Sequence, residues 1–212
     1  MFRPFLLSLL ITLFSTVGGA ENNVAILLHQ APTLNSHTIN LALRAYENAK
    51  REGYSHSPIL TIVDYTLPSN QKRLWVFNLN TQQLLFYTYV SQGIHTGIKW
   101  AHYFSNQPGS YDSSLGLYKT DNAYFGHWGY ALRLKGLDRK FNDNAWKRNI
   151  VIHGGKYVSE KFIEHYGYAG NSHGCFVVSN TLIYPLINTI KNGSLLFVYY
   201  PNKEWLAYSK FV

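Results

Sequence analysis

The pattern of apolar and polar positions predicts a chain made mostly of short β-strands. Runs rich in β-branched, aliphatic and aromatic residues recur at short intervals and are bounded by polar residues and glycines, which is typical of strands. The first three runs are expected to pair antiparallel, and the last is expected to close the sheet. The runs cover residues 60–65, 73–79, 84–90, 115–119, 130–134, 150–152, 176–178 and 195–200.

Three other stretches have helical spacing. In residues 37–52, small and apolar residues recur every three to four positions after the capping Asn35 and before Gly53, which predicts an amphipathic helix packed under the sheet. Two shorter helices are expected at 160–166 and at about 181–191, and the residues that bound them are Ser159, Gly167 and Gly193. Many short strands with few helices predict a mainly β fold, a β-sandwich or partly closed barrel of mixed strands with a few peripheral helices.

The N-terminus has the features of a secretory signal peptide. A short basic segment with Arg3 precedes the apolar residues 5–14, and small residues follow at 17–20. This order predicts cleavage after Ala20, so residues 1–20 are assigned to the signal peptide. The apolar run is too short to span a bilayer, and no stable membrane anchor is expected after cleavage. The mature protein is therefore expected to be periplasmic or secreted.

The remainder divides into an N-terminal arm, residues 21–34, and one domain, residues 35–212. Of the 212 residues, 46% are hydrophobic and 14% are charged, which fits one well-packed core. Basic residues exceed acidic ones by 19 to 11, and loss of Arg3 leaves 18 − 11 = +7. This charge suits an anionic partner such as the cell wall, although a merely soluble basic surface fits equally well. The aromatic-rich composition does not suggest nucleic acid.

The candidate chemistry lies between His153 and Cys175. Cys175 is the only cysteine and precedes the strand at 176–178, whereas His153 ends the strand at 150–152, so both are expected at strand ends where loops expose them. A thiol reacts as its thiolate, and a neighbouring imidazole can take the proton during attack. In an exported protein, one unpaired cysteine is either buried or kept for its reactivity.

Glycines on both sides of this pair predict the supporting geometry. Gly154 and Gly155 allow a backbone carbonyl to approach the second ring nitrogen of His153 and so hold one tautomer. Gly174 allows a tight turn in which its own amide and that of Cys175 face one point. Two such donors would stabilise an oxyanion, at about 3–4 kcal/mol each.

Two other interpretations of the cysteine remain open. Cys175 could be a small buried residue without reactivity, although the polar and glycine residues at 172–174 favour a loop. His173 and Cys175, together with His153, could also bind zinc. The sequence has no second cysteine and no histidine pair at the HExxH spacing, so we do not expect a metal.

The same motifs resemble a known family. His153-Gly154 and Ser172-His173-Gly174-Cys175 are similar to the signature of the L,D-transpeptidase (YkuD-type) catalytic domain, in the branch called the murein L,D-transpeptidase catalytic domain. The resemblance covers residues 35–200. The further matching segments are Phe104-Ser105-Asn106, Gly109-Ser110, Ser113-Ser114-Leu115-Gly116, Gly136-Leu137 and Arg148-Asn149-Ile150-Val151-Ile152-His153.

Two departures from the family pattern stand out. Val177 lies two places after the cysteine, where members commonly have Asn or Arg, so the substrate contact made by that polar residue is not expected here. The separation of histidine and cysteine, 175 − 153 = 22 residues, is longer than usual. Arg148 could supply a charge nearby.

The resemblance implies a β-sandwich enzyme that acts on peptidoglycan stem peptides and needs no metal or organic cofactor. Cys175 would attack the carbonyl between the L-centre of diaminopimelate and the terminal D-alanine of a donor tetrapeptide, forming a thioester. His153 would act first as base and then as acid. Transfer of the acyl group to an amine gives a 3-3 cross-link, and transfer to water gives L,D-carboxypeptidase activity. Sensitivity to carbapenem-type inhibitors is a further expectation of the family.

Residues around the pair are assigned to substrate binding. The long loop 105–114 and the aromatic segment 124–129 are expected to cover or line a cleft. Core packing of the aromatic rings, with His127 on the surface, is an equal alternative. The residues assigned to substrate binding are His173, Ser172, Asn171, Gly154, Tyr124, His127 and Arg148.

Three rival functions differ in what they require. A sortase also places histidine before cysteine, but it needs Thr-Leu-x-Thr before the cysteine and an arginine after it, and this sequence has neither. A cysteine hydrolase of murein peptides shares every catalytic residue and differs only in the acceptor. A non-catalytic wall-binding module would not need the thiol, so its binding should survive Cys175→Ala.

Overall fold

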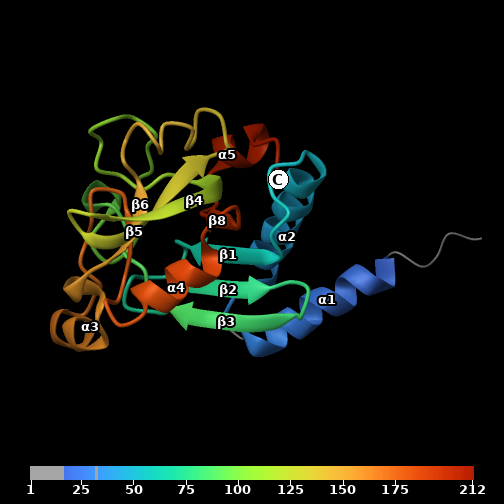
Figure 1. The fold of residues 1–212 in the computed structure, drawn as a ribbon, viewed down its shortest axis with the longest axis horizontal. Helices are drawn as coiled ribbons and strands as arrows, with labels where there is room; N and C mark the ends of the chain where they lie inside the picture. Colours follow the sequence, from blue (N-terminus) through green and yellow to red (C-terminus); the bar gives the residue numbers. More distant parts are fainter. Residues whose placement is uncertain (1–16, 32) are drawn as a thin grey trace, which may run out of the picture.

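One mixed sheet of eight strands forms the body of the protein (Figure 1). The structure, a computed structural model, describes residues 17–31 and 33–212. Its strands are β1 (Ile59–Asp64), β2 (Leu74–Asn78), β3 (Gln83–Thr88), β4 (Gly116–Gly126), β5 (Gly129–Gly136), β6 (Val151–Gly154), β7 (Phe176–Val178) and β8 (Leu195–Tyr199). Their order in the sheet is β3-β2-β1-β8-β4-β5-β6-β7. All eight predicted strands are present, and the mainly β fold with a partly closed barrel is confirmed.

The two ends of the sheet approach each other, so that the barrel is nearly closed. The amide of Ser91, just after β3, donates to the carbonyl oxygen of Val177 in β7 at 2.9 Å. The amide of Val177 in turn donates to Ser91 Oγ at 3.1 Å. A parallel bridge joins Gly93 to Ser172. These contacts hold residues 91–93 against the segment that carries Cys175.

The last strand, β8, lies in the middle of the sheet rather than at its end. It pairs parallel with β1 and antiparallel with β4, so the prediction that residues 195–200 close the sheet is wrong. Every residue of β1 and β8 is buried, and strands buried on both faces belong at the centre of a covered sheet. The expected antiparallel pairing of β1, β2 and β3 is confirmed.

The predicted helices are present. Helix α2 (Ser36–Arg51) begins where the Asn35 side chain accepts from the His37 amide at 2.8 Å, and its buried face packs on β1 and β8. Helix α3 (Glu160–Tyr166) begins at the predicted cap Ser159 and ends at Gly167, which has a left-handed conformation. Helix α4 (Ile183–Ile190) is shorter than the predicted 181–191.

The N-terminal arm is largely helical, which its sequence does not predict. Helix α1 (Val17–Gln30) ends on the sheet: Gln30 Nε2 donates to the Gln82 carbonyl at 2.7 Å, and Gln30 Oε1 accepts from the Leu84 amide at 2.9 Å. The side chain thereby satisfies backbone groups beside the edge strand β3. Three other short helices are not predicted from the sequence, namely η1 (Ile94–Thr96), η2 (Lys156–Val158) and α5 (Lys203–Tyr208), although the side chain of Asn202 caps α5.

The predicted signal peptide is mostly outside the described residues, which begin at residue 17. The predicted cleavage position after Ala20 falls within α1. Among the described helices, none combines the length and the apolar character that crossing a membrane requires.

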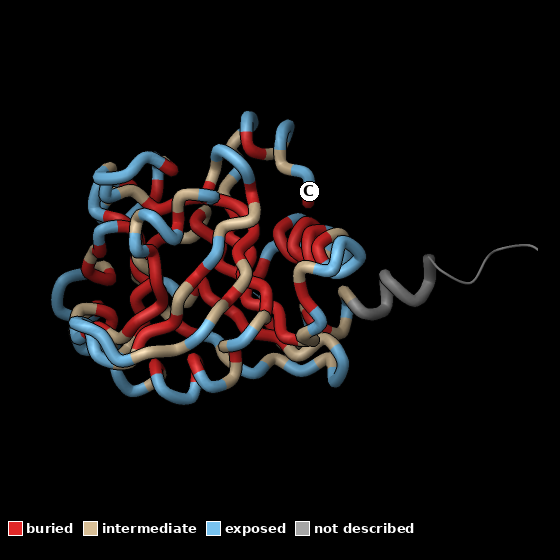
Figure 2. The backbone as a smooth tube through the Cα atoms, turned by 45° about the horizontal axis from the view of Figure 1, so that its top comes forward, coloured by how far each residue is buried: buried red, intermediate tan, exposed pale blue. Residues whose placement is uncertain are grey.

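Buried apolar side chains form two clusters. The buried segments of the backbone run through the interior, and most exposed segments lie around them (Figure 2). The large cluster joins the sheet to α2 and α4. The small one consists of Val158, Ile163, Ala169 and Val177, and Cys175 packs against it. The nucleophile predicted from the sequence therefore lies on the sheet face that η2 and α3 cover, and not in the main core.

We predict that Ser91→Ala lowers stability. The substitution removes the acceptor of the buried Val177 amide, and an orphaned buried donor costs about 1–3 kcal/mol. Urea unfolding followed by tryptophan fluorescence should show a lower midpoint with an unchanged slope. In the matched control Ser179→Ala, the lost hydroxyl is on the surface beside Thr181, and the cost should stay below about 0.5 kcal/mol. Equal losses in the two variants would show that the barrel closure contributes little.

Candidate functional site

Neighbouring strands place Cys175 and His153 on one face of the sheet. Strands β6 and β7 pair in parallel, with Ile152 opposite Phe176 and His153 opposite Val177. Cys175 directly precedes Phe176, and side chains alternate between the two faces along a strand. Cys175 and His153 therefore share the face opposite to that of Ile152 and Phe176, and they lie two residues apart along the strand direction.

The same face continues onto the hairpin of β4 and β5. Ala131 on β5 is paired both with Tyr124 on β4 and with His153 on β6, and directly paired residues share a face. The ring of Tyr124 lies under the guanidinium of Arg133, with 4.4 Å from Cζ to the ring centroid. Tyr124 is thus on the same side of the sheet as the histidine and outside the main core.

His153 is buried, with 2% of its surface exposed, so the prediction that a loop exposes its side chain is wrong. The backbone of the next residue holds its ring. Its Nδ1 lies 2.9 Å from the carbonyl oxygen of Gly154. Because a carbonyl oxygen only accepts, Nδ1 carries the proton and Nε2 keeps a free lone pair. Burial lowers the pKa of His153, which keeps the ring neutral at neutral pH. The predicted backbone contact is confirmed. Gly154 orients the imidazole through its carbonyl oxygen.

Cys175 is a free thiol that is partly buried. Burial raises the pKa of Cys175, and this effect outweighs the opposing effects of the Val151 amide and the Arg148 guanidinium. The sulfur lies 3.6 Å from the carbonyl oxygen of Asn149. Within the described part of the chain, no hydrogen bond joins Cys175 to His153. The resting pair is therefore a neutral thiol near a neutral imidazole.

Gly174 turns the chain into β7 and lets a neighbouring loop approach closely. Its φ is +105°, in the left-handed region that favours glycine. A Cβ at this position would lie 2.5 Å from the carbonyl oxygen of Asp112. Its amide donates to Ser172 Oγ at 3.1 Å. The prediction that the Gly174 amide faces an oxyanion is therefore wrong, because this amide already donates to the Ser172 hydroxyl.

Ser172 and Asn171 brace the turn before the cysteine. Ser172 is buried, and its hydroxyl donates to the Cys175 carbonyl oxygen at 2.7 Å. Asn171 Nδ2 donates to the Gly97 carbonyl oxygen at 2.9 Å. Placing Ser172 on a substrate-facing wall is wrong because its hydroxyl is buried and bonded, and the amide of Asn171 is likewise used to hold a loop.

Arg148 connects the long loop 105–114 to the nucleophile. Its guanidinium donates to the Ser105 carbonyl at 2.7 Å, the Ser114 hydroxyl at 2.7 Å and the Asp112 carbonyl at 2.6 Å. Burial lowers the pKa of Arg148, but a guanidinium stays charged at neutral pH, and its charge favours the thiolate of Cys175. The charge expected near the nucleophile is present, while the hydrogen-bond donors of Arg148 serve the loop.

His173 is exposed beside the nucleophile and packs on a tyrosine of unusual backbone geometry. The ring centroids of His173 and Tyr111 are 4.2 Å apart. Tyr111 has φ +58°, which is rare for a bulky residue, and its ring also meets His95 at 5.6 Å. Strained residues of this kind cluster at functional sites. These three rings form an accessible wall on the loop side of Cys175.

The tip of the β4–β5 hairpin places Trp128, and not His127, on the histidine of the pair. The rings of Trp128 and His153 are stacked, with 5.4 Å between centroids and 19° between planes. His127 is exposed, and its ring meets the edge of Trp128. The sequence pattern points to Tyr124 and His127 but does not identify Trp128. The spacing of Gly126 and Gly129, which predicts a two-residue turn, is the signal that could have found it.

The long separation of histidine and cysteine has a structural cause. The intervening residues contain η2 and α3, which supply Val158 and Ile163 to the small cluster. Val177 is fully buried in that cluster. An apolar residue therefore suits this position, and a substrate contact from it is not available.

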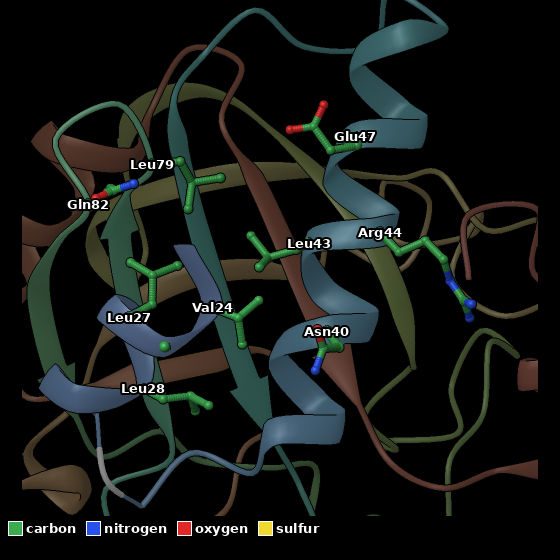
Figure 3. A pocket seen from close by; sticks show the side chains of 10 residues that line it. Val24, Leu27, Leu28, Asn40, Leu43, Arg44, Glu47, Leu79 and Gln82 are labelled. Atoms are coloured by element: carbon green, nitrogen blue, oxygen red, sulfur yellow. The ribbon is translucent and has the colours of Figure 1, made fainter. Parts of the chain in front are cut away.

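The cavity shown in Figure 3 lies away from this pair. It has a volume of about 680 Å³ and opens between α1, α2 and the β2–β3 turn. Leu27, Leu43 and Leu79 line it, with Arg44 and Glu47 on α2.

The described residues also contain no group of three or more histidine, cysteine, aspartate or glutamate side chains that could hold a metal ion.

The chain matches one protein family over most of its length. Residues 30–199 match the family model of the L,D-transpeptidase catalytic domain. This range contains every residue of the candidate site. No curated protein matches the chain.

Solved structures that resemble the chain are distant in sequence. An L,D-transpeptidase from Mycobacterium smegmatis is 13% identical over 68% of this chain and 59% of its own, with a TM-score of 0.43. The helical cell shape determining protein Pgp2 from Campylobacter jejuni is 13% identical over 71% and 50%, with a TM-score of 0.46. L,D-transpeptidase LdtMt1 in complex with imipenem is 13% identical over 67% of this chain and 59% of its own, with a TM-score of 0.41. The chain spans about half to three-fifths of the length of these proteins.

We predict that Gly174→Ala destabilises the protein and suppresses the reactivity of Cys175. The new Cβ would meet the Asp112 carbonyl, so the turn must shift. Gly109→Ala is the matched control, since its φ is +77° and a Cβ there meets no atom within 4 Å. Gly109→Ala should cost about 1–2 kcal/mol in urea unfolding, and Gly174→Ala clearly more. Equal costs and equal alkylation rates would contradict the close approach.

We predict that alkylation of Cys175 by iodoacetamide accelerates as pH rises, with a midpoint above the usual thiol pKa of about 8.5. Burial raises the pKa of Cys175, so the reactive thiolate forms only as pH passes that raised value. His153→Ala should leave the midpoint nearly unchanged because the two side chains are not ion-paired at rest. An alkylation rate that is already constant near neutral pH, and that falls in His153→Ala, would show a resting ion pair instead.

Proposed function

Because the chain belongs to the L,D-transpeptidase catalytic domain family, we propose that it is a peptidoglycan L,D-transpeptidase with Cys175 as nucleophile and His153 as base. One observation carries the proposal. A free thiol and a buried imidazole, whose Nδ1 is bonded to a backbone carbonyl, lie on one face of two neighbouring strands. This arrangement leaves Nε2 as the proton acceptor on the side of the ring away from the Gly154 carbonyl.

The reaction couples proton transfer to attack on the donor peptide. Cys175 Sγ attacks the carbonyl carbon between the L-centre of diaminopimelate and D-alanine, while the thiol proton passes to His153 Nε2. The tetrahedral intermediate collapses to a thioester, and the imidazolium protonates the leaving amine of D-alanine. An acceptor amine then attacks the thioester, gives a proton to His153 and restores the thiol.

The remaining polar groups suit this route. A neutral imidazole can accept a proton, and a neutral thiol has one to give, so the resting state needs no prior transfer. We assign the oxyanion contact to the amide of Cys175, since Ser172 occupies that of Gly174. One such donor contributes about 3–4 kcal/mol to transition-state stabilisation. Arg148 adds positive charge beside the reacting sulfur.

The proposal includes where the protein works and what it meets. Residues 1–20 have the features of a signal peptide, so the mature protein is proposed to act in the periplasm or outside the cell. Its net positive charge suits the anionic cell wall. The donor is proposed to be a tetrapeptide stem, and carbapenem-type inhibitors are proposed to acylate Cys175. A wall-binding module without catalysis would have no use for a buried histidine held in one tautomer.

We predict that purified disaccharide-tetrapeptide forms a transient acyl adduct on Cys175 of the mature protein and releases D-alanine. Intact-mass spectrometry with peptide mapping detects the adduct, and Cys175→Ala should give neither product. His153→Ala should slow adduct formation by about 10²–10⁴-fold, as expected for loss of a general base. His165→Ala, which removes an exposed histidine of α3, is the matched control and should react normally.

The products distinguish the remaining functions. Cross-linked 3-3 dimers support the transpeptidase, whereas free disaccharide-tripeptide without dimers supports the L,D-carboxypeptidase. No adduct and no D-alanine under any condition would contradict the enzyme for this substrate and favour the wall-binding module.

A further inference from the structure

An exposed tryptophan lies flat on the proposed catalytic base. Trp128 keeps 60% of its surface exposed, yet its ring is stacked nearly parallel to that of the buried His153. The centroid distance of 5.4 Å makes this an offset stack, in which one face of the indole overlaps part of the imidazole, and much of the rest of the side chain meets solvent. Burial in the hydrophobic core does not explain a tryptophan at this position.

The hairpin tip that carries Trp128 extends past the strands beside it. Pairing of β4 with β8 stops at Lys119, and pairing of β5 with β6 begins at Ala131. Thr120 and Asp121 still exchange backbone hydrogen bonds with residues 192–194. From Ala123 to Tyr130 the ladder pairs the two hairpin strands with each other, and the hairpin closes where Gly126 faces Gly129, whose φ is +77°. The hairpin thus projects a two-residue turn over the end of β6, where His153 lies.

We infer that Trp128 is a positioning residue for the proposed reaction: its indole holds the plane of the His153 ring and shields one ring face from water. The catalytic meaning of this inference rests on the proposed function. The stack and its effect on the histidine can be measured without any substrate.

The stack supplies a restraint that the hydrogen bond alone does not. The outer torsion of a histidine side chain is broad, and one bond from Nδ1 to the Gly154 carbonyl leaves the ring free to tilt about that bond. A parallel indole limits the tilt, so the lone pair of His153 Nε2 keeps one direction relative to the thiol. Proton transfer depends steeply on such alignment.

Shielding also favours the neutral ring. Water stabilises the imidazolium more than the imidazole, so excluding water lowers the pKa of His153. Attraction between an imidazolium and an indole face acts in the opposite sense. Burial is the leading influence on this group, so we expect removal of the indole to raise the pKa of His153.

Charged neighbours do not account for the state of the histidine. Arg133 on β5 lies over Trp146, and Arg148 is bound to the loop 105–114. The lowered pKa of His153 arises from burial, which the Gly154 carbonyl partly opposes, and not from these charges. The other titratable side chains on the surrounding elements are Tyr118, Lys119, Asp121 and Tyr124 on β4, His127 in the turn, Tyr130 and Lys135 on β5, Lys156 and Tyr157 on η2, Tyr184 on α4, and Cys175 before β7. None of them is among the causes of the lowered pKa of His153.

The test compares Trp128→Ala, Trp128→Phe and Trp128→Leu with Phe125→Ala. Phe125 is 72% exposed on the same hairpin and packs on Tyr130, away from the base, so it is the matched control. NMR titration of the His153 Cε1–H signal gives the pKa in the absence of substrate. We expect a raised pKa in Trp128→Ala, and values close to the parent in Trp128→Phe and Phe125→Ala.

The kinetic readout separates orientation from shielding. In D-alanine release, kcat of Trp128→Ala should fall about ten- to hundredfold with little change in KM. Trp128→Leu keeps an apolar cover without a flat ring, so it should keep the parent pKa but lose kcat. If Trp128→Ala does not fold, Trp128→Leu provides the kinetic test in its place.

Two results would overturn the inference. If Trp128→Ala has the same His153 pKa and the same kcat as Phe125→Ala, Trp128 is an ordinary surface aromatic residue. A lowered pKa in Trp128→Ala would mean that attraction to the imidazolium, and not shielding, dominates. If the parent protein releases no D-alanine at all, the proposed function fails, while the titration still decides whether Trp128 shields the histidine.

Discussion

The parallel pairing of β6 with β7 is the constraint on which the rest of the site depends. It sets His153 and Cys175 on one sheet face, two residues apart along the strand direction. Both strands are short and need support from outside. The long hairpin strand β5 pairs with β6, and β7 lies against Ser91 where the sheet nearly closes. The geometry of the proposed chemistry is therefore a consequence of the barrel closure as much as of the two reactive side chains.

Burial then decides the protonation state of the pair. It raises the pKa of Cys175 and lowers that of His153, so both groups rest uncharged in surroundings that disfavour an isolated charge. Charge develops when substrate arrives, next to Arg148 and the backbone amide of Cys175. Hydrogen bonds from Ser172 and Arg148 to backbone carbonyls hold the surrounding loops in place before that happens.

Local pattern was sufficient for part of this structure. Hydrophobic periodicity predicts the eight strands, and capping residues predict helices α2 and α3. Residue chemistry singles out His153 and Cys175. These patterns do not predict the central place of β8, because strand order depends on pairing between distant segments. To predict the stack of Trp128 on the base, one must know the register of three strands. To predict that the Gly174 amide donates to Ser172, one must know the backbone path of a turn. Helix α1 is held by contacts to β3 rather than by a sharp periodicity of its own.

The most direct test of the central claim is single-turnover acylation of Cys175 by disaccharide-tetrapeptide, measured in H₂O and in D₂O. Transfer of the thiol proton to His153 during attack predicts an adduct on Cys175 that forms more slowly in D₂O. Equal rates in the two solvents, rising with the thiolate fraction, would contradict a neutral pair. A reaction without any adduct on Cys175 would contradict the assignment of the nucleophile itself.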